Sequence, residues 1–312
     1  MLATSALIFV AVIVQTVLYA VVYLGVLIVE RPADPARAPA LSGYVDVGLG
    51  LASIAIALPL VLLAARYTQS RPAGSVSSVS GRLRWGWLGL CLALATLTTG
   101  LMIAGSVGLM SLTGAADAAP TEGGRWVGTG TFVGGLAMLL VLVPLQAAAE
   151  EYLFRGWLLQ AIGAFARSPW PAIAIQAVLF AALHGWGTPW GFVDLVAFGV
   201  VLGWLTVRTG GLEAAIALHV VNNLILMVLA AADGSLTLDE TAADMPWEGM
   251  VVDTLTVLAY AAAVTWLARR RTVQTRAPAD GPPSTAADAD DEAGEQIGDG
   301  VVGEVAAARA DG

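Results

Sequence analysis

The amino-acid sequence predicts an all-α, polytopic membrane protein with about eight transmembrane helices around a polar cavity. Hydrophobic residues make up 57% of its 312 residues and charged residues only 12%, whereas roughly a quarter of a soluble domain is charged. The mean hydropathy is +0.76. In addition, several uncharged runs reach the roughly 20 helical residues that cross a hydrocarbon core about 30 Å thick.

Proline, glycine and charged residues delimit these apolar runs. The runs predict helices at 3–29, 44–65, 86–113, 130–162, 170–186, 191–207, 212–231 and 249–268. They divide the chain into N-terminal helices (1–129), a catalytic core of four helices (130–230), an outer loop with the last helix and its basic flank (231–276) and a tail (277–312). The acidic tail lacks aromatic residues, a composition that favours disorder.

The basic residues predict how the chain is oriented. All 15 are arginine, and most of them lie in alternate connections and after the last helix. Because cytoplasmic connections hold the excess of basic residues, we expect a multi-pass protein of the cell membrane with both termini in the cytoplasm. We expect no nucleic-acid partner, since no basic groove with interleaved aromatic residues is evident. The single Cys91 excludes an intrachain disulfide and a cysteine-rich zinc site.

A pair of adjacent glutamates lies in the fourth apolar run. Glu151 and Arg155 are spaced i,i+4, so they share a helix face and can pair. Glu150 points about 100° away from Glu151 and is free for another task. These charges could simply be a solvated helix end. If the helix continues to about residue 162, however, Glu150 lies near mid-membrane, where an ionisable group indicates a functional site.

The only two histidines also lie in apolar runs. Phe180 precedes His184 by one helical turn, so the phenyl ring can restrict the imidazole. His219 and Asn223 share a face of the seventh predicted helix. A core histidine with one hydrogen bond, or ordinary hydrogen bonds between membrane helices, would account for each motif alone. Three such motifs on three helices favour a common site.

Two other features have simpler interpretations. Asp46, Asp194 and Asp253 lie near predicted helix ends, where we expect solvation at the membrane interface. Gly199 and Gly203 form a GxxxG pattern, which is either a close helix contact or a chance match in a chain with 35 glycines.

A carboxylate, two imidazoles and an amide suit the hydrolysis of a peptide bond in a dry cavity. Glu150 can take a proton from water while His184 orients that water or shares the role of base. His219 and Asn223 can hold the developing oxyanion. The same four residues can instead ligate one divalent metal ion, with zinc the ordinary choice for such donors. No His-Glu-x-x-His motif supports the metal interpretation.

In order, spacing and host helices, the motifs resemble those of the CAAX-processing and bacteriocin-processing (CPBP, or Abi) intramembrane proteases, which are related to the type II CAAX prenyl endopeptidases. They are Glu150-Glu151-x-x-x-Arg155, Phe180-x-x-x-His184 and His219-x-x-x-Asn223. The resemblance covers about 130–230. It implies that Glu150 and His184 activate water, and that His219 and Asn223 stabilise the oxyanion or contribute to a metal site. The residues that would support the site are Glu151, Arg155 and Phe180. Such proteins are commonly called metalloproteases, although a metal-free glutamate mechanism has been argued for relatives.

We therefore expect an endopeptidase that cleaves membrane-embedded or lipid-modified proteins or peptides within the bilayer. A non-proteolytic immunity or scaffold protein that keeps the motifs is the first alternative. A proton-coupled transporter with Glu150 and the histidines as a relay is the second. The absence of an internal repeat and of paired interrupted helices counts against the transporter.

Overall fold

The structure, a computed structural model, describes residues 16–17, 20–25, 28, 43–67, 69, 71–115, 126–237 and 241–277. The chain divides into two compact units, Met1–Thr275 and Arg276–Gly312. Within the described part of the first unit, the regular elements are helices, and one isolated bridge joins Ser78 to Gly211. The predicted all-α class is confirmed.

The helices follow the predicted apolar runs closely. They are α2 (Gly43–Ala55) and α3 (Ala57–Tyr67), α4 (Trp85–Thr113), α6 (Thr129–Glu151) continued by the π-helical η2 (Tyr152–Leu158) and α7 (Leu159–Gly163), α8 (Trp170–Leu183), α9 (Pro189–Thr209), α10 (Glu213–Asp233) and α11 (Trp247–Arg270). Two short 3₁₀ turns, η1 (Ala73–Val76) and η3 (Ala242–Asp244), lie in connections. The first predicted run, 3–29, falls largely outside the described residues.

Six helical stretches of the described residues are long and apolar enough to cross a membrane. α8 is shorter than predicted: it has 14 residues, which is about 21 Å at a rise of about 1.5 Å per residue and less than a hydrocarbon core of about 30 Å. It ends early because Gly185 and Gly187 adopt positive φ angles of 96° and 34°, which glycine tolerates best. The predicted total of eight full spans is therefore not confirmed.

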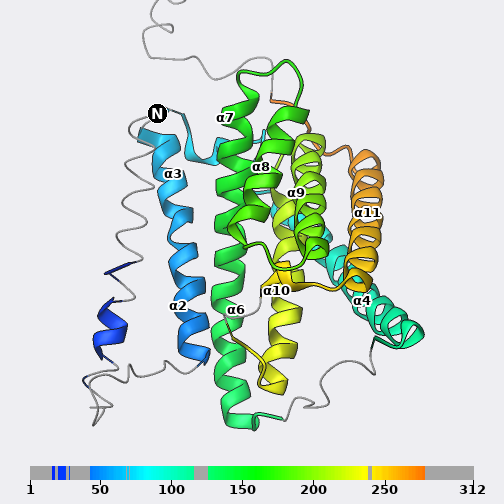
Figure 1. The fold of residues 1–312 in the computed structure, drawn as a ribbon. Helices are drawn as coiled ribbons and strands as arrows, with labels where there is room; N and C mark the ends of the chain where they lie inside the picture. The colour runs from blue at the N-terminus through cyan, green and yellow to red at the C-terminus, as the bar shows by residue number, and fades with distance from the viewer. Residues whose placement is uncertain are drawn as a thin grey trace, which may run out of the picture. The chain divides into compact units, whose positions relative to one another are not determined.

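α10 occupies the centre of the described helices (Figure 1). It packs against α4, α6 and α9, while α9 also packs against α8 and α11. α2 lies against α6, and α11 lies against α4. The three helices that begin or carry the predicted motifs, α6, α8 and α10, therefore belong to one packed group.

The arginine-bearing connections meet at one end of this group. Arg71 Nη2 donates to Gln160 Oε1 at 2.9 Å, and Val79 N donates to Gly210 O at 2.9 Å. At the opposite end, Val127 N donates to Ala232 O at 3.4 Å. The connections thus alternate between two ends as the arginine pattern predicts. Which end faces the cytoplasm stays a prediction.

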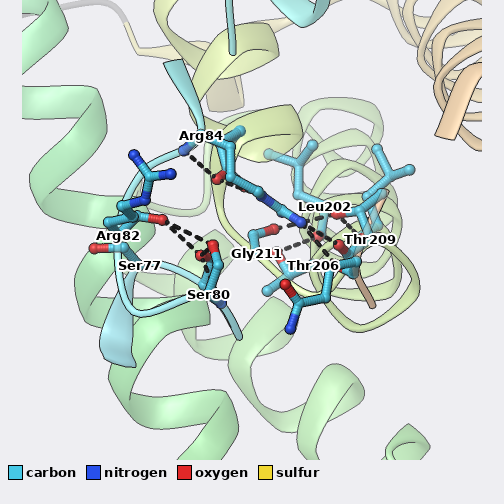
Figure 2. Close-up of polar contacts among 12 residues, drawn as sticks. Ser77, Ser80, Arg82, Arg84, Leu202, Thr206, Thr209 and Gly211 are labelled. Carbon is cyan, nitrogen blue, oxygen red and sulfur yellow. Dashed lines mark hydrogen bonds and ion pairs between the residues drawn. The ribbon is translucent and has the colours of Figure 1, made fainter. Parts of the chain in front are cut away.

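Arg84 fastens the start of α10 (Figure 2). Its Nε and Nη2 donate to the two carboxylate oxygens of the fully buried Glu213 at 2.8 and 2.6 Å. Its Nη1 donates to the carbonyl oxygens of Thr209 at 3.1 Å and Gln274 at 2.7 Å. Such forked, charge-assisted bonds fix geometry as well as adding stability. The connection before α4 and the one before α10 are therefore held together.

The GxxxG pattern is a close helix contact between α9 and α8. A Cβ atom on Gly199 would lie 2.8 Å from Ala177 Cα, and one on Gly203 would lie 2.8 Å from Gln176 Nε2. Gln176 also donates across the contact to Gly199 O at 2.8 Å. Small residues allow this close backbone approach, so the chance interpretation is wrong.

We predict that Gly199→Ala lowers the thermal unfolding midpoint of the protein in detergent relative to Gly134→Ala. The added methyl group at Gly199 collides with the backbone of α8, and such overpacking costs about 1–3 kcal/mol. Gly134 has open space around it, so alanine there gains about 1 kcal/mol of helix propensity without a clash. Equal midpoints for the two variants would contradict the contact.

Candidate functional site

The glutamate motif lies at the junction of α6 and the π-helical segment η2, inside the packed group. Glu150 is 9% exposed, and Glu151 and Arg155 are fully buried. The interpretation of these charges as a solvated helix end is therefore wrong. Single π-helical turns occur frequently at functional sites, and here the turn carries Arg155 directly after the two glutamates.

Glu151 bonds two of the other predicted residues. Its Oε1 accepts a hydrogen bond from Arg155 Nη1 at 2.9 Å and one from His219 Nδ1 at 2.7 Å. The first contact confirms the predicted i,i+4 pairing, and the second ties α6 to α10. Because an ionised carboxylate only accepts hydrogen bonds, Nδ1 of His219 carries the proton. Nε2 is left to face the site.

Glu150 offers one oxygen to that imidazole. Its Oε1 accepts from Gln146 Nε2 at 2.6 Å, while its buried Oε2 has no hydrogen-bond partner among the described residues. That free oxygen lies 3.7 Å from His219 Nε2. The pair therefore has room to share a proton or to flank a small polar molecule through hydrogen bonds.

Gln146 also connects Glu150 with the third motif. Its Oε1 accepts from Asn223 Nδ2 at 3.4 Å. We did not predict a role for this residue from the sequence. The available signal is weak: Gln146 is the only side-chain amide in α6 and precedes Glu150 by one helical turn.

His184 joins the site through Phe180. Its Nδ1 donates to the carbonyl oxygen of Phe180 at 2.8 Å, and the two ring centroids are 4.5 Å apart. The Phe180 ring also lies 5.9 Å from the His219 ring and beneath the Arg155 guanidinium at 4.4 Å. Among the described residues, Glu150 bonds Gln146 and lies near His219, and His184 makes no hydrogen bond to that carboxylate. The predicted action of His184 on a water molecule beside Glu150 stays a prediction.

The predicted metal set, which includes the amide of Asn223, stays a prediction. The part of the chain that the structure describes contains no group of three or more His, Cys, Asp or Glu side chains placed to hold a metal ion. Of the predicted donors, Glu150 and His219 lie close to each other, whereas a catalytic zinc takes three protein ligands. We therefore derive no catalytic step through a metal.

A second buried polar cluster lies behind the site. Asp194 of α9 and Asp253 of α11 are each 4% exposed, and their carboxyl groups are within hydrogen-bonding reach of each other. Thr254 Oγ1 donates to Asp194 Oδ1 at 3.2 Å. The expectation that these aspartates are solvated at the interface is wrong. Asp253 lines a small hollow together with Asn222, so Asn222 and Asn223 serve different faces of α10.

All three motifs lie in a segment of the chain that matches one known protein family. Residues 132–225 match the family model described as type II CAAX prenyl endopeptidase Rce1-like. This segment is Rce1-like. The predicted relationship is confirmed, and the Rce1-like segment holds all three motifs.

The chain also resembles a bacterial protein. YyaK, an uncharacterized protein of Bacillus subtilis (strain 168), is 30% identical over 197 residues, which are 61% of this chain. The aligned part spans 63% of YyaK, which is less than two thirds of its length. No solved structure shows a significant match to the chain.

We predict that Glu151→Ala lowers the free energy of unfolding by about 3–5 kcal/mol, because it leaves the buried Arg155 unpaired. The double variant Glu151→Ala, Arg155→Met removes both charges and is expected to lose less. Unfolding of both variants in mixed detergent, followed by circular dichroism, measures the difference. A double variant less stable than the single one would contradict a dependence of Arg155 on Glu151.

Proposed function

We propose that this protein is an intramembrane endopeptidase in which Glu150 activates water for attack on a peptide bond and His219, which lies beside it, helps to hold the oxyanion. The observation that carries the proposal is the free, buried Oε2 of Glu150, which faces His219 Nε2 at 3.7 Å. A buried carboxylate oxygen without a partner is costly, so its retention beside an imidazole favours a chemical task. The Rce1-like segment, whose family is one of endopeptidases, supports the same reaction.

The charges around Glu150 favour a mobile proton. Glu150 and Glu151 supply two negative charges, and Arg155 supplies one positive charge. A proton shared between Glu150 Oε2 and His219 Nε2 makes this buried group electrically neutral. Glu151 holds the imidazole by Nδ1, so only Nε2 can take up or release that proton.

The reaction needs two proton transfers, and Glu150 can perform both. As the carboxylate, it accepts a proton from water, and the resulting hydroxide attacks the scissile carbonyl carbon. The tetrahedral oxyanion accepts hydrogen bonds from His219 Nε2, when that atom is protonated, and from the Asn223 amide. The proton on Glu150 then passes to the leaving nitrogen as the carbon–nitrogen bond breaks. A carboxyl product and an amine product result.

His184 has the role of a water-orienting residue in this scheme. Its Nδ1 carries the proton that it donates to Phe180 O, so Nε2 is an acceptor in the neutral ring. An acceptor at the half-buried end of α8 can bind an entering water molecule before Glu150 deprotonates it. The proposed substrates are peptide segments that reach the bilayer interior, either membrane-embedded or carried there by a lipid group.

We predict that Glu150→Gln lowers the cleavage rate of the purified protein by about 10²–10⁴-fold, the usual contribution of a general base. His184→Ala is expected to lower it as well. The assay uses two probes in detergent micelles: a prenylated peptide ending in a CAAX sequence and an unmodified transmembrane peptide.

Asn223→Ala and Asn222→Ala form a matched pair for this assay. Loss of an oxyanion donor costs about 10²–10³-fold in rate, and we expect that loss for Asn223 alone, because Asn222 lines the hollow behind the site. Equal cleavage by wild type and the Glu150 variant would refute the protease. A folded wild type that cleaves neither probe would favour the immunity or scaffold alternative.

We predict that cleavage persists after the protein is purified with a chelator and shown to be metal-free by elemental analysis. The reason is that the proposed steps use only Glu150, His219, His184 and Asn223 as proton carriers and hydrogen-bonding groups. The contrary result is specific: one zinc ion per chain, lost in His184→Ala and in His219→Ala, with activity restored by added zinc, would establish the metal mechanism.

A further inference from the structure

Gln146 links two parts of the proposed site that come from different helices. It lies in α6 and is 4% exposed. Its Nε2 is 2.6 Å from Glu150 Oε1, and its Oε1 is 3.4 Å from Asn223 Nδ2 of α10. The base and the oxyanion donor of the proposed reaction are therefore joined through one side chain.

Hydrogen-bond chemistry fixes the direction of this link. Because a carboxylate only accepts, Gln146 must present its NH₂ group to Glu150. Its carbonyl oxygen then points the other way and requires a donor, which is the NH₂ group of Asn223. The reversed amide orientation would set the carbonyl oxygen of Gln146 against an oxygen of Glu150 and leave that buried hydrogen bond unmade. The chain of donors thus runs from Asn223 through Gln146 to Glu150.

This direction settles which atoms remain for catalysis. Oε1 of Glu150 already accepts a hydrogen bond from Gln146, whereas Oε2 has no partner among the described residues, so Oε2 is the freer oxygen to act as the base. One hydrogen of the Asn223 amide is occupied, so the second is free to meet an oxyanion. We infer that Gln146 is a positioning residue that holds the base oxygen of Glu150 and the oxyanion donor of Asn223 in register, an inference that rests on the proposed function.

The test compares Gln146→Met with Gln176→Met in the cleavage assay. Methionine keeps the length of the side chain but makes neither hydrogen bond. Gln176 is a matched control because it is also a fully buried glutamine, and its amide bonds the backbone of Ile173 and Gly199 away from Glu150. We expect Gln146→Met to lower kcat about 10- to 100-fold with little change in KM, as loss of a bond to a charged group costs about 1.5–3 kcal/mol.

A double-variant cycle separates positioning from general damage. Gln146→Met combined with Asn223→Ala is expected to lose less kcat than the product of the two single losses, since both act through one link. The matched cycle of Gln176→Met with Asn223→Ala is expected to be multiplicative. An unchanged kcat in Gln146→Met, or multiplicative losses in both cycles, would overturn the inference while the protease proposal stands.

A second measurement does not need activity. Subtracting the infrared spectrum of Glu150→Gln from that of wild type isolates the carboxyl bands of Glu150. We expect those bands to shift in Gln146→Met and to stay in place in Gln176→Met. Unshifted bands would overturn the assignment of Gln146. If the bands shift although wild type cleaves no probe, the proposed function fails and the contact holds.

Discussion

The rest of the site depends on the two hydrogen bonds that the carboxylate of Glu151 accepts. It is fully buried, and it accepts from Arg155 on the same helical stretch and from His219 on α10. A buried carboxylate, guanidinium and imidazole are each costly alone, and together they offset much of that cost. The same contact decides the proton position on His219 and therefore leaves Nε2 toward Glu150. One ionic interaction thus fixes both the packing of α6 on α10 and the chemistry available between them.

The sequence predicts the helices and the motifs because both depend on local spacing. Apolar runs gave α4, α9, α10 and α11 to within a few residues, and i,i+4 spacing gave the Glu151–Arg155 pair. The shared site could also be anticipated, since ionisable residues in three apolar runs need one another. Local spacing does not predict which residue of another helix a given side chain will contact. Nothing in the sequence says that Glu151 holds His219, or that His219 Nε2 lies 3.7 Å from Glu150 Oε2.

The residues that sequence reasoning missed or misplaced act over long distances in the chain. In the sequence, Gln146 is only an amide in an apolar helix, and its role becomes evident when the fold places Asn223 beside it. The sequence suggests that Asp194 and Asp253 are charges at the membrane interface, but the packing of α9 against α11 buries both. Arg84 reads as one more positive charge of a cytoplasmic connection, yet it pairs with Glu213, which is 129 residues away in the chain. Each role depends on tertiary contacts, which a single sequence without a known fold does not contain.

Two neighbouring asparagines of α10 contact different parts of the structure, which shows how the fold keeps the site in place. Asn223 faces Gln146 and the site, whereas the neighbouring Asn222 faces the hollow beside Asp253. Phe198 separates these regions, because it lines the hollow while its ring lies 5.8 Å from that of His219. A rotation of α10 would therefore break the contact between Asn223 and Gln146 and displace Asn222 from the hollow. Arg84 also holds the first residue of α10. The proposed reaction, with its base on α6 and its oxyanion donors on α10, needs the two helices to be held in a fixed arrangement.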